Sequence, residues 1–211
     1  MTAQLKDTFD KDRSAFVFIE FQSEWLDESG VLFEKLVQDK PAFRNAVTQA
    51  ALVLKAAREH DGRIAHAGLD LRDDPGYQLF GKGKQVLGLR SAIPKAQTWT
   101  GTGAEFVAPF IPEQGEFIMH GRSGASVLKN SSLDPYLRNN RIDTIFLMGF
   151  ATHVCVESTL REAHDLGLNV YVVSDACAAF TRAQDEYFHE HILHHFGGGT
   201  DAAELVRLLK A

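Results

Sequence analysis

The 211-residue chain has 45% hydrophobic and 24% charged side chains, which is the composition of a globular protein and excludes an intrinsically disordered or collagen-like chain. Its formal charge is -6 at pH 7 and it has no basic cluster, so we expect neither a nucleic-acid partner nor a membrane partner. A polar N-terminal segment and the lack of an apolar run of roughly 20 residues predict a cytoplasmic protein.

Short apolar runs alternate with amphipathic segments along the chain. The runs that predict strands are residues 14–21, 63–71, 116–120, 143–149 and 169–174. The segments that predict helices are residues 40–60, 154–166, 183–195 and 202–209. Residues 71–101 form a long irregular stretch that we expect to shape a site or a subunit contact, and residues 197–199, all glycine, predict a helix C-cap and a flexible turn.

This alternation predicts one α/β domain covering residues 1–211. Strands separated by helices of this length are joined by right-handed crossovers, so they form a mostly parallel sheet between two helical layers. We expect a three-layer α/β/α, Rossmann-like arrangement with about five to six strands. Because ligands bind beyond the carboxyl ends of such strands, Glu20, Asp70 and residues 150–155 should face one crevice.

The chain has two cysteines, Cys155 and Cys177, which are too few for a disulfide-built scaffold. Cys155 lies where a predicted strand passes directly into a helix. Free N–H groups and the positive end of the helix dipole stabilise a thiolate there, and they can hold an oxyanion formed at a carbonyl. At this stage two interpretations of Cys155 remain open, a nucleophile with a lowered pKa and a small buried apolar residue.

A longer motif surrounds this cysteine, since residues 149–180 read GFATHVCVESTLREAHDLGLNVYVVSDACAAF. It resembles the signature segment of the isochorismatase-like cysteine hydrolase superfamily. The positions that carry the resemblance are Gly149, Ala151, Thr152, Cys155, Val156, Thr159, Ala163, Gly167, Asp175, Ala176 and Cys177. It extends upstream to the segments Glu20-Phe21-Gln22 and Gly101-Thr102-Gly103-Ala104-Glu105, and to the strand ending near Arg122. The resemblance implies the isochorismatase-like fold and a homo-oligomer, either a dimer or a tetramer.

Members of this family that carry the cysteine hydrolyse small amide, carbamoyl or ureido compounds through a Cys-Asp-Lys triad. The resemblance implies that Cys155 attacks the carbonyl to form a thioester, which water then hydrolyses. It assigns the place of the family aspartate to Glu20 and that of the lysine to Arg122. It also implies a cis peptide bond at Phe150-Ala151 and an oxyanion hole made by the N–H groups of Ala151 and Cys155.

The two replacements leave alternatives open. Glutamate keeps the carboxylate needed as a general base, whereas arginine keeps the positive charge but cannot release a proton. A Glu20–Arg122 ion pair beside the thiol would preserve the electrostatics of the triad, or it would be a remnant in a ligand-binding or assembly protein. His120 and Lys129 are the other cations that could take the place of Arg122. A redox thiol protein would instead require the two cysteines to approach each other.

The sequence also gives expectations for the pocket and for metals. His191 and His195 have the spacing of two metal ligands on a helix, but the H-E-x-x-H pattern is absent. The metal-binding Asp-x-His element of related nicotinamidases is replaced by Ala65-His66-Ala67. We therefore expect no metal and no cofactor. The residues expected to line the substrate pocket are Phe21, Gln22, Trp25, His66, Trp99 and Thr152. The alternative for the aromatic residues is core packing, and the alternative for His66 is a hydrogen-bonded core histidine.

Overall fold

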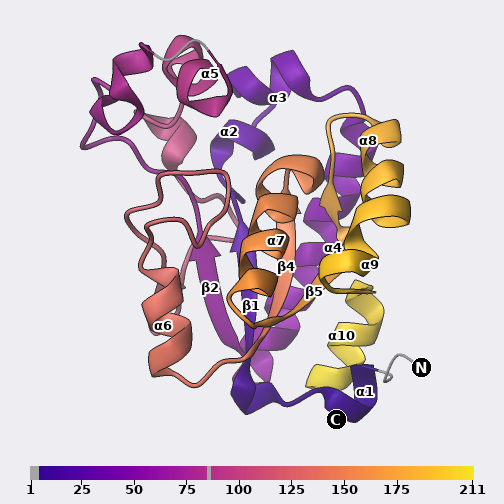
Figure 1. The fold of residues 1–211 in the computed structure, drawn as a ribbon. Coiled ribbons are helices and arrows are strands. Elements are labelled where there is room, and N and C mark those ends of the chain that lie inside the picture. The colour runs from indigo at the N-terminus through magenta and orange to yellow at the C-terminus, as the bar shows by residue number, and fades with distance from the viewer. Residues whose placement is uncertain (1–4, 85–86) are drawn as a thin grey trace.

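The computed structural model describes residues 5–84 and 87–211. In this part of the chain, six parallel strands form one sheet in the order β3-β2-β1-β4-β5-β6. The strands are β1 (Ser14–Ile19), β2 (Arg63–Ala67), β3 (Phe117–Ile118), β4 (Thr144–Phe150), β5 (Asn169–Ala178) and β6 (Gly198–Thr200). The parallel sheet of about five to six strands is thus confirmed, and Figure 1 shows it between two layers of helices.

The helices of the described residues differ widely in length. The longer ones are α4 (Lys40–Glu59), α5 (Leu89–Ala96), α6 (Leu133–Asn139), α7 (Glu157–Asp165) and α10 (Ala202–Leu209). The shorter ones are α1 (Leu5–Thr8), α2 (Ser23–Leu26), α3 (Val31–Leu36), α8 (Arg182–Tyr187) and α9 (Leu193–Phe196). None of these helices has the length and apolarity needed to cross a membrane.

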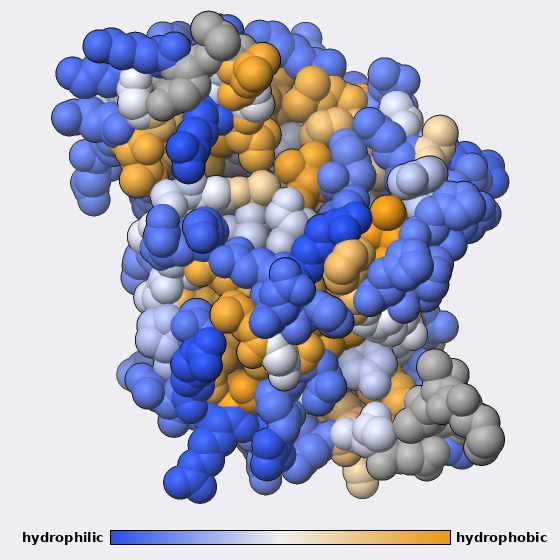
Figure 2. All heavy atoms as spheres, viewed as in Figure 1, coloured by the Kyte–Doolittle hydropathy of each residue, from blue (hydrophilic) through white to orange (hydrophobic). Residues whose placement is uncertain are grey.

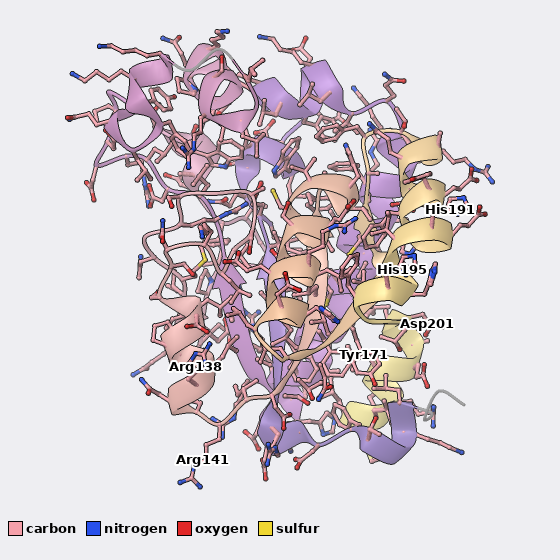
Figure 3. The ribbon with its side chains drawn as sticks, in the orientation of Figure 1. Arg138, Arg141, Tyr171, His191, His195 and Asp201 are labelled. Carbon is pink, nitrogen blue, oxygen red and sulfur yellow. The ribbon has the colours of Figure 1, made fainter. Side chains whose placement is uncertain are left out.

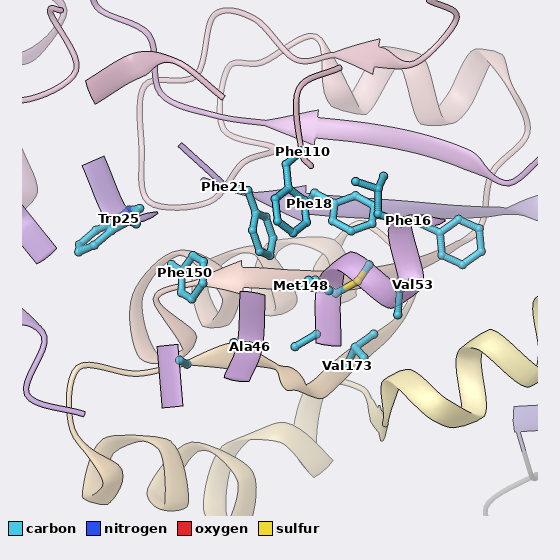
Figure 4. Packing of buried hydrophobic residues seen from close by; sticks show 14 of the residues in the cluster. Phe16, Phe18, Phe21, Trp25, Ala46, Val53, Phe110, Met148, Phe150 and Val173 are labelled. Atoms are coloured by element: carbon cyan, nitrogen blue, oxygen red, sulfur yellow. The ribbon is translucent and has the colours of Figure 1, made fainter. Parts of the chain in front are cut away.

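The central strands are apolar throughout because helices cover both of their faces. All residues of β1 and β4 are buried. In β1, Phe16 and Phe18 pack with α4 and α10, whereas Val17 and Ile19 pack on the opposite side with α6 and α7. Figure 4 shows the first of these two cores, in which aromatic rings fill the space between the sheet and α4. The predicted three-layer arrangement is confirmed.

Helix α4 illustrates how local sequence sets an element. Asp39 accepts a hydrogen bond from the backbone N–H of Ala42 at 3.1 Å, which caps the helix, and Pro41 occupies the first turn, where its missing N–H costs nothing. The buried side chains of α4 recur at helical spacing and face the sheet. The helix therefore spans nearly all of the segment predicted from the sequence.

Several predicted boundaries change in the structure. The first strand ends at Ile19 because Glu20 adopts a left-handed conformation with φ of 59°, which turns the chain. A π-helical turn at Thr152–Val156 precedes α7, and another at Phe188–Ile192 joins α8 to α9, so the predicted helix 183–195 is helical throughout but widens to a π turn at its centre.

Two segments that were expected to be irregular contain regular structure, although Gly197 caps α9 as predicted. The glycine run at 197–199 contributes to edge strand β6, where a Cβ on Gly197 would lie 2.4 Å from the carbonyl oxygen of Val170, so only glycine allows this close approach. The stretch 71–101 contains a 3₁₀ segment at Gln78–Gly83 and helix α5. Together with α2 and α3, α5 lies beyond the carboxyl ends of the strands, at the top of Figure 1.

Candidate active site

The carboxyl ends of β1 and β4 meet at an unusually close backbone contact. Gly149 has a φ of +124°, and a Cβ at this position would lie only 2.0 Å from the carbonyl oxygen of Ile19. Only glycine permits both this conformation and this approach. The contact brings Glu20, which follows β1, next to the turn that follows β4.

Glu20 and Arg122 form a buried ion pair at this edge of the sheet. Arg122 Nη1 donates to Glu20 Oε1 at 2.6 Å, and the two side chains are 3% and 2% exposed. The other guanidinium nitrogens donate to the carbonyl oxygens of Gly124 and Ala125, at 2.8 and 2.6 Å. Trp25 Nε1 donates to Glu20 Oε2 at 2.7 Å. Every carboxylate oxygen of Glu20 and every guanidinium nitrogen of Arg122 therefore has a hydrogen-bond partner, which a buried pair requires.

The Cys155 thiol lies beside this pair, and its ionisation differs from the sequence-based expectation. Burial raises the pKa of Cys155 to about 12; the Glu20 carboxylate also raises it, and Arg122 lowers it. Burial lowers the pKa of Arg122, but Glu20 and Cys155 raise it by more, so the guanidinium stays charged. The predicted lowering of the thiol pKa at a helix N-terminus is therefore wrong, because enclosure outweighs it. At neutral pH a protonated thiol faces an ion pair.

The turn between β4 and α7 carries the remaining polar groups of the site. The peptide bond between Phe150 and Ala151 is cis. The Ala151 carbonyl accepts the backbone N–H groups of Val154 and Val156, at 3.0 and 3.3 Å, which starts the helical turn containing Cys155. The backbone N–H groups assigned to the oxyanion hole, those of Ala151 and Cys155, belong to this turn.

A cavity of about 440 Å³ opens above these groups. Glu20, Arg122, Ala151 and Cys155 line it, and most of the remaining lining is apolar. Figure 2 shows hydrophobic residues gathered around the hollow between the α5 segment and α7. Of the pocket residues predicted from the sequence, Trp25 and Trp99 line the cavity.

Two predicted pocket residues are instead part of the packing that supports Glu20. The ring of Phe21 is buried and stacks on Phe110, with ring centroids 4.0 Å apart. Gln22 donates to the carbonyl oxygens of Leu69 and Ala104, at 3.1 and 2.6 Å, and accepts from the N–H of Leu69 at 3.0 Å. Because the left-handed turn redirects the chain at Glu20, the two following side chains face the interior and hold neighbouring loops.

Three further polar residues lie outside the cavity. His66 is fully buried, and its Nε2 lies 2.7 Å from Glu116 Oε2. Thr152 is buried, and its hydroxyl donates to Asp185 of α8 at 2.8 Å. Asp70 forms an ion pair with the arginine two residues later at the surface. His66 is therefore the hydrogen-bonded core histidine that was the alternative to a lining residue, whereas the predictions that Thr152 lines the pocket and that Asp70 faces the crevice are wrong.

The sequence did not identify the residues that close the cavity from above. Phe80, Leu89 and Ile93 contribute apolar side chains from the segment that was expected to be irregular, and Phe180 contributes one from the loop after β5. The spacing of Leu89 and Ile93, four residues apart, was the available signal, since it places them on one face of α5.

Lys129 and His120, the two other cations considered for the place of Arg122, and the second thiol, Cys177, lie in different surroundings. Lys129 lines the cavity with an exposed side chain, whereas His120 is absent from its lining. Cys155 and Cys177 are both free thiols. Cys177 Sγ lies 3.7 Å from the carbonyl oxygen of Leu147, and burial raises its pKa.

The C-terminal histidines lie away from this cavity. Figure 3 shows His191, in the π-helical turn after α8, and His195, in α9, on the other side of the view from α5. Among the described residues, no group of three or more histidine, cysteine, aspartate or glutamate side chains is arranged to hold a metal ion.

Comparisons with known proteins agree with this architecture. Residues 14–204 match the family model of the isochorismatase domain. The chain is 29% identical over 168 residues to the isochorismatase family protein YwoC of Bacillus subtilis (strain 168), covering 78% of this chain and 83% of that protein. It is 27% identical over 183 residues to the ureidoacrylate amidohydrolase RutB of Enterobacter sp. (strain 638), covering 80% and 76%.

The fold has a solved counterpart of low sequence identity. A cysteine hydrolase from Pseudomonas syringae pv. phaseolicola 1448A superposes with a TM-score of 0.80 at 22% identity, covering 96% of this chain and 94% of that chain. The match of the family model to nearly the whole chain carries the assignment. This chain belongs to the isochorismatase family of hydrolases.

Proposed function

We propose that the chain is a cysteine hydrolase that cleaves the C–N bond of a small amide, carbamoyl or ureido compound through a thioester intermediate. The observation that carries this proposal is the position of the Cys155 thiol, which lines a cavity beside the buried Glu20–Arg122 pair. Family membership supports hydrolysis, and the amidohydrolase relative supports the type of bond.

Proton transfer to Glu20 starts the proposed reaction. Because the resting thiol is neutral, Glu20 accepts its proton as Sγ attacks the carbonyl carbon. The tetrahedral intermediate then collapses, and the leaving amine takes that proton from Glu20. Water next attacks the thioester carbonyl while Glu20 accepts a proton from it. The acid product leaves, and this proton returns to the Cys155 sulfur.

Arg122 and the turn after β4 would stabilise the charges that arise during these steps. Arg122 holds one carboxylate oxygen of Glu20 and favours the sulfur anion as it forms, since its charge lowers the pKa of Cys155. The backbone N–H groups of Ala151 and Cys155 would bind the developing oxyanion. A lysine is not required for this scheme, because no step takes a proton from the cation.

A second function, ligand binding without turnover, is favoured by one observation. Burial raises the pKa of Cys155 to about 12, so attack requires simultaneous removal of a tightly held proton. A chain in which Glu20 cannot perform this transfer would keep the cavity and the fold. The homo-oligomer expected from the resemblance is compatible with both functions.

The test combines product detection with trapping of the intermediate. Purified protein is incubated with a panel of primary amides, N-carbamoyl amines and ureido acids, and ammonia release is measured. Acid-quenched samples are digested and the peptide containing Cys155 is weighed for the acyl adduct. We expect ammonia release and an adduct on Cys155 with at least one class of substrate.

Two matched variants give the controls. Cys155→Ala should abolish both signals, whereas Cys177→Ala should keep both, because Cys177 does not line the cavity. Saturable binding of panel members without ammonia release or adduct would favour the second function.

A further inference from the structure

We propose that the substrate of this site is a neutral amide with a bulky apolar acyl group. This group fills the space between Cys155 and an apolar cap, which consists of Leu32 and Leu36 of α3 and Leu89 and Ile93 of α5. This inference rests on the proposed hydrolase function. It adds the chemical class of the group attached to the reacting carbonyl.

The first argument is the composition of the cavity wall. Aromatic and aliphatic side chains come from several separate segments, and they include Trp25, Phe80, Leu89, Ile93, Trp99 and Phe180. Leucines of the rim remain partly or largely exposed, with Leu89 39% and Leu87 81% accessible. An apolar group bound here would cover hydrophobic surface that water otherwise contacts, which favours binding.

The second argument is the distribution of charge. Among the described residues that line the cavity, Glu20 is the acidic one, and it is already paired with Arg122 and Trp25. The other charged side chains, Arg90 and Lys129, are exposed. A charged substrate group placed deep in the cavity would lose its hydration without gaining a partner, so the inner space favours a neutral group.

The third argument is size. The cavity of about 440 Å³ is within the range of pockets that bind drug-sized ligands, roughly 300 to 1,000 Å³. A minimal amide would leave most of this volume unfilled. Each methylene buried in it should strengthen binding about fourfold, equivalent to about 0.8 kcal/mol.

The chain supplies its own reporter for a binding test. It has two tryptophans, Trp25 and Trp99, and both line the cavity. Intrinsic fluorescence of the Cys155→Ala variant, which cannot form an acyl adduct, is titrated with propanamide, butanamide, pentanamide and hexanamide. Glutaramate serves as a control, since it resembles hexanamide in length but ends in a carboxylate.

We expect the dissociation constant to fall about fourfold per methylene, which is about 60-fold from propanamide to hexanamide. Glutaramate should bind more weakly than hexanamide. Less than twofold change across the series, or tighter binding of glutaramate, would overturn the proposal.

A pair of leucine variants tests the cap directly. Leu89 on α5 lines the cavity, whereas Leu52 on α4 is 51% exposed and does not. Leu89→Ser should weaken hexanamide binding about fivefold and leave propanamide binding unchanged, and Leu52→Ser should change neither. If Leu89→Ser binds hexanamide as tightly as the protein that retains Leu89, the apolar cap does not hold the acyl group.

These outcomes separate the two proposals. Chain-length-dependent binding without ammonia release by the wild type would support the apolar acyl site and contradict the hydrolase. Hydrolysis of small polar amides with no gain from added methylenes would do the reverse.

Discussion

A buried cluster and a partly buried cluster of carboxylate and cation lie at this sheet, and their internal geometry is similar. In the first, Glu20 accepts from Arg122 at 2.6 Å. In the second, Glu116 accepts from Arg58 Nε at 2.7 Å and lies 2.7 Å from His66 Nε2. In both, each carboxylate oxygen has a hydrogen-bond partner within the protein. Pair geometry alone therefore does not distinguish a reacting carboxylate from a structural one.

The surroundings of the two clusters differ. Glu20 lines the cavity of about 440 Å³ and faces a thiol, whereas Glu116 is not among the residues that line this cavity. Burial on its own raises the pKa of Glu116, but hydrogen bonds from Arg58, the Glu113 N–H and His66 lower it to about 2. A carboxylate so strongly held in its ionised form is a poor proton acceptor. Glu116 instead joins β3, α4 and β2, so the difference between the two carboxylates is that Glu20 faces a cavity and the Cys155 thiol.

Replacing each of the two glutamates with glutamine tests whether their roles differ, and the largest effect is expected for Glu20→Gln. Glu20→Gln should lower kcat/KM about 10³-fold, because no group then takes the thiol proton. The same change should raise the rate at which iodoacetamide alkylates Cys155 at pH 8 several-fold, since the Glu20 carboxylate raises the pKa of that thiol. Steady-state kinetics and peptide mass spectrometry measure the two effects.

The matched control for this prediction is Glu116→Gln, which should keep kcat/KM within about twofold. A similar loss of activity in both variants would mean that structural disturbance, and not proton transfer, explains the loss. Slower alkylation in Glu20→Gln would mean that the carboxylate helps to ionise the resting thiol, contrary to the environment described above.

At the second cluster the expected effect is on stability. Ionised Glu116 stabilises the fold through charge-assisted hydrogen bonds, and Glu116→Gln should cost about 2 kcal/mol in urea unfolding at pH 7. Because the pKa of Glu116 is about 2 in the fold and about 4.3 in the unfolded chain, this contribution is complete above roughly pH 4.3 and disappears as the pH falls toward 2. The wild type and variant should therefore converge in stability between pH 4 and 2.

The surface neighbour Glu113 provides the control. Its side chain is 64% exposed and pairs with Arg58 at 3.0 Å, so Glu113→Gln should cost less than about 0.5 kcal/mol. Equal losses of stability for Glu113→Gln and Glu116→Gln would mean that the net charge around Arg58, and not the hydrogen bonds of the Glu116 carboxylate, stabilises the fold.

Much of the fold could be predicted from the periodicity of apolar residues. The predictions failed where a helix is too short to repeat its apolar face. The 20 residues of α4 repeat an apolar face often enough to be recognised, and the buried strands β1 and β4 are continuous apolar runs. Helix α5 has only eight residues and contains Pro94, which argues against a helix in sequence alone. Short helices of this kind depend on tertiary contacts, which a local pattern does not encode.

The candidate site was predicted unevenly for a related reason. A motif with fixed spacing nominates Cys155, and the same resemblance nominates Glu20 and Arg122, which the structure brings together. Phe21 and Gln22 follow Glu20 in the sequence but do not line the cavity, because the left-handed turn at Glu20 directs their side chains into the protein interior. The cavity wall comes from segments far apart in the chain, so its residues become apparent only when the packing is known.

Variants of the two tryptophans, Trp25 and Trp99, test how Glu20 is positioned, and their expected effect on activity is the smallest of those considered. Both line the cavity, but Trp25 Nε1 donates to Glu20 at 2.7 Å, whereas Trp99 Nε1 is buried with no hydrogen-bond partner among the described residues. Trp25→Phe keeps an aromatic ring and removes one hydrogen bond to a charged group, worth about 1.5 kcal/mol. If that bond positions the carboxylate for proton transfer, kcat should fall about tenfold while KM changes less than about threefold. Trp99→Phe should change KM and leave kcat within about twofold, and an equal loss of kcat in both variants would show that the indole N–H of Trp25 does not position Glu20.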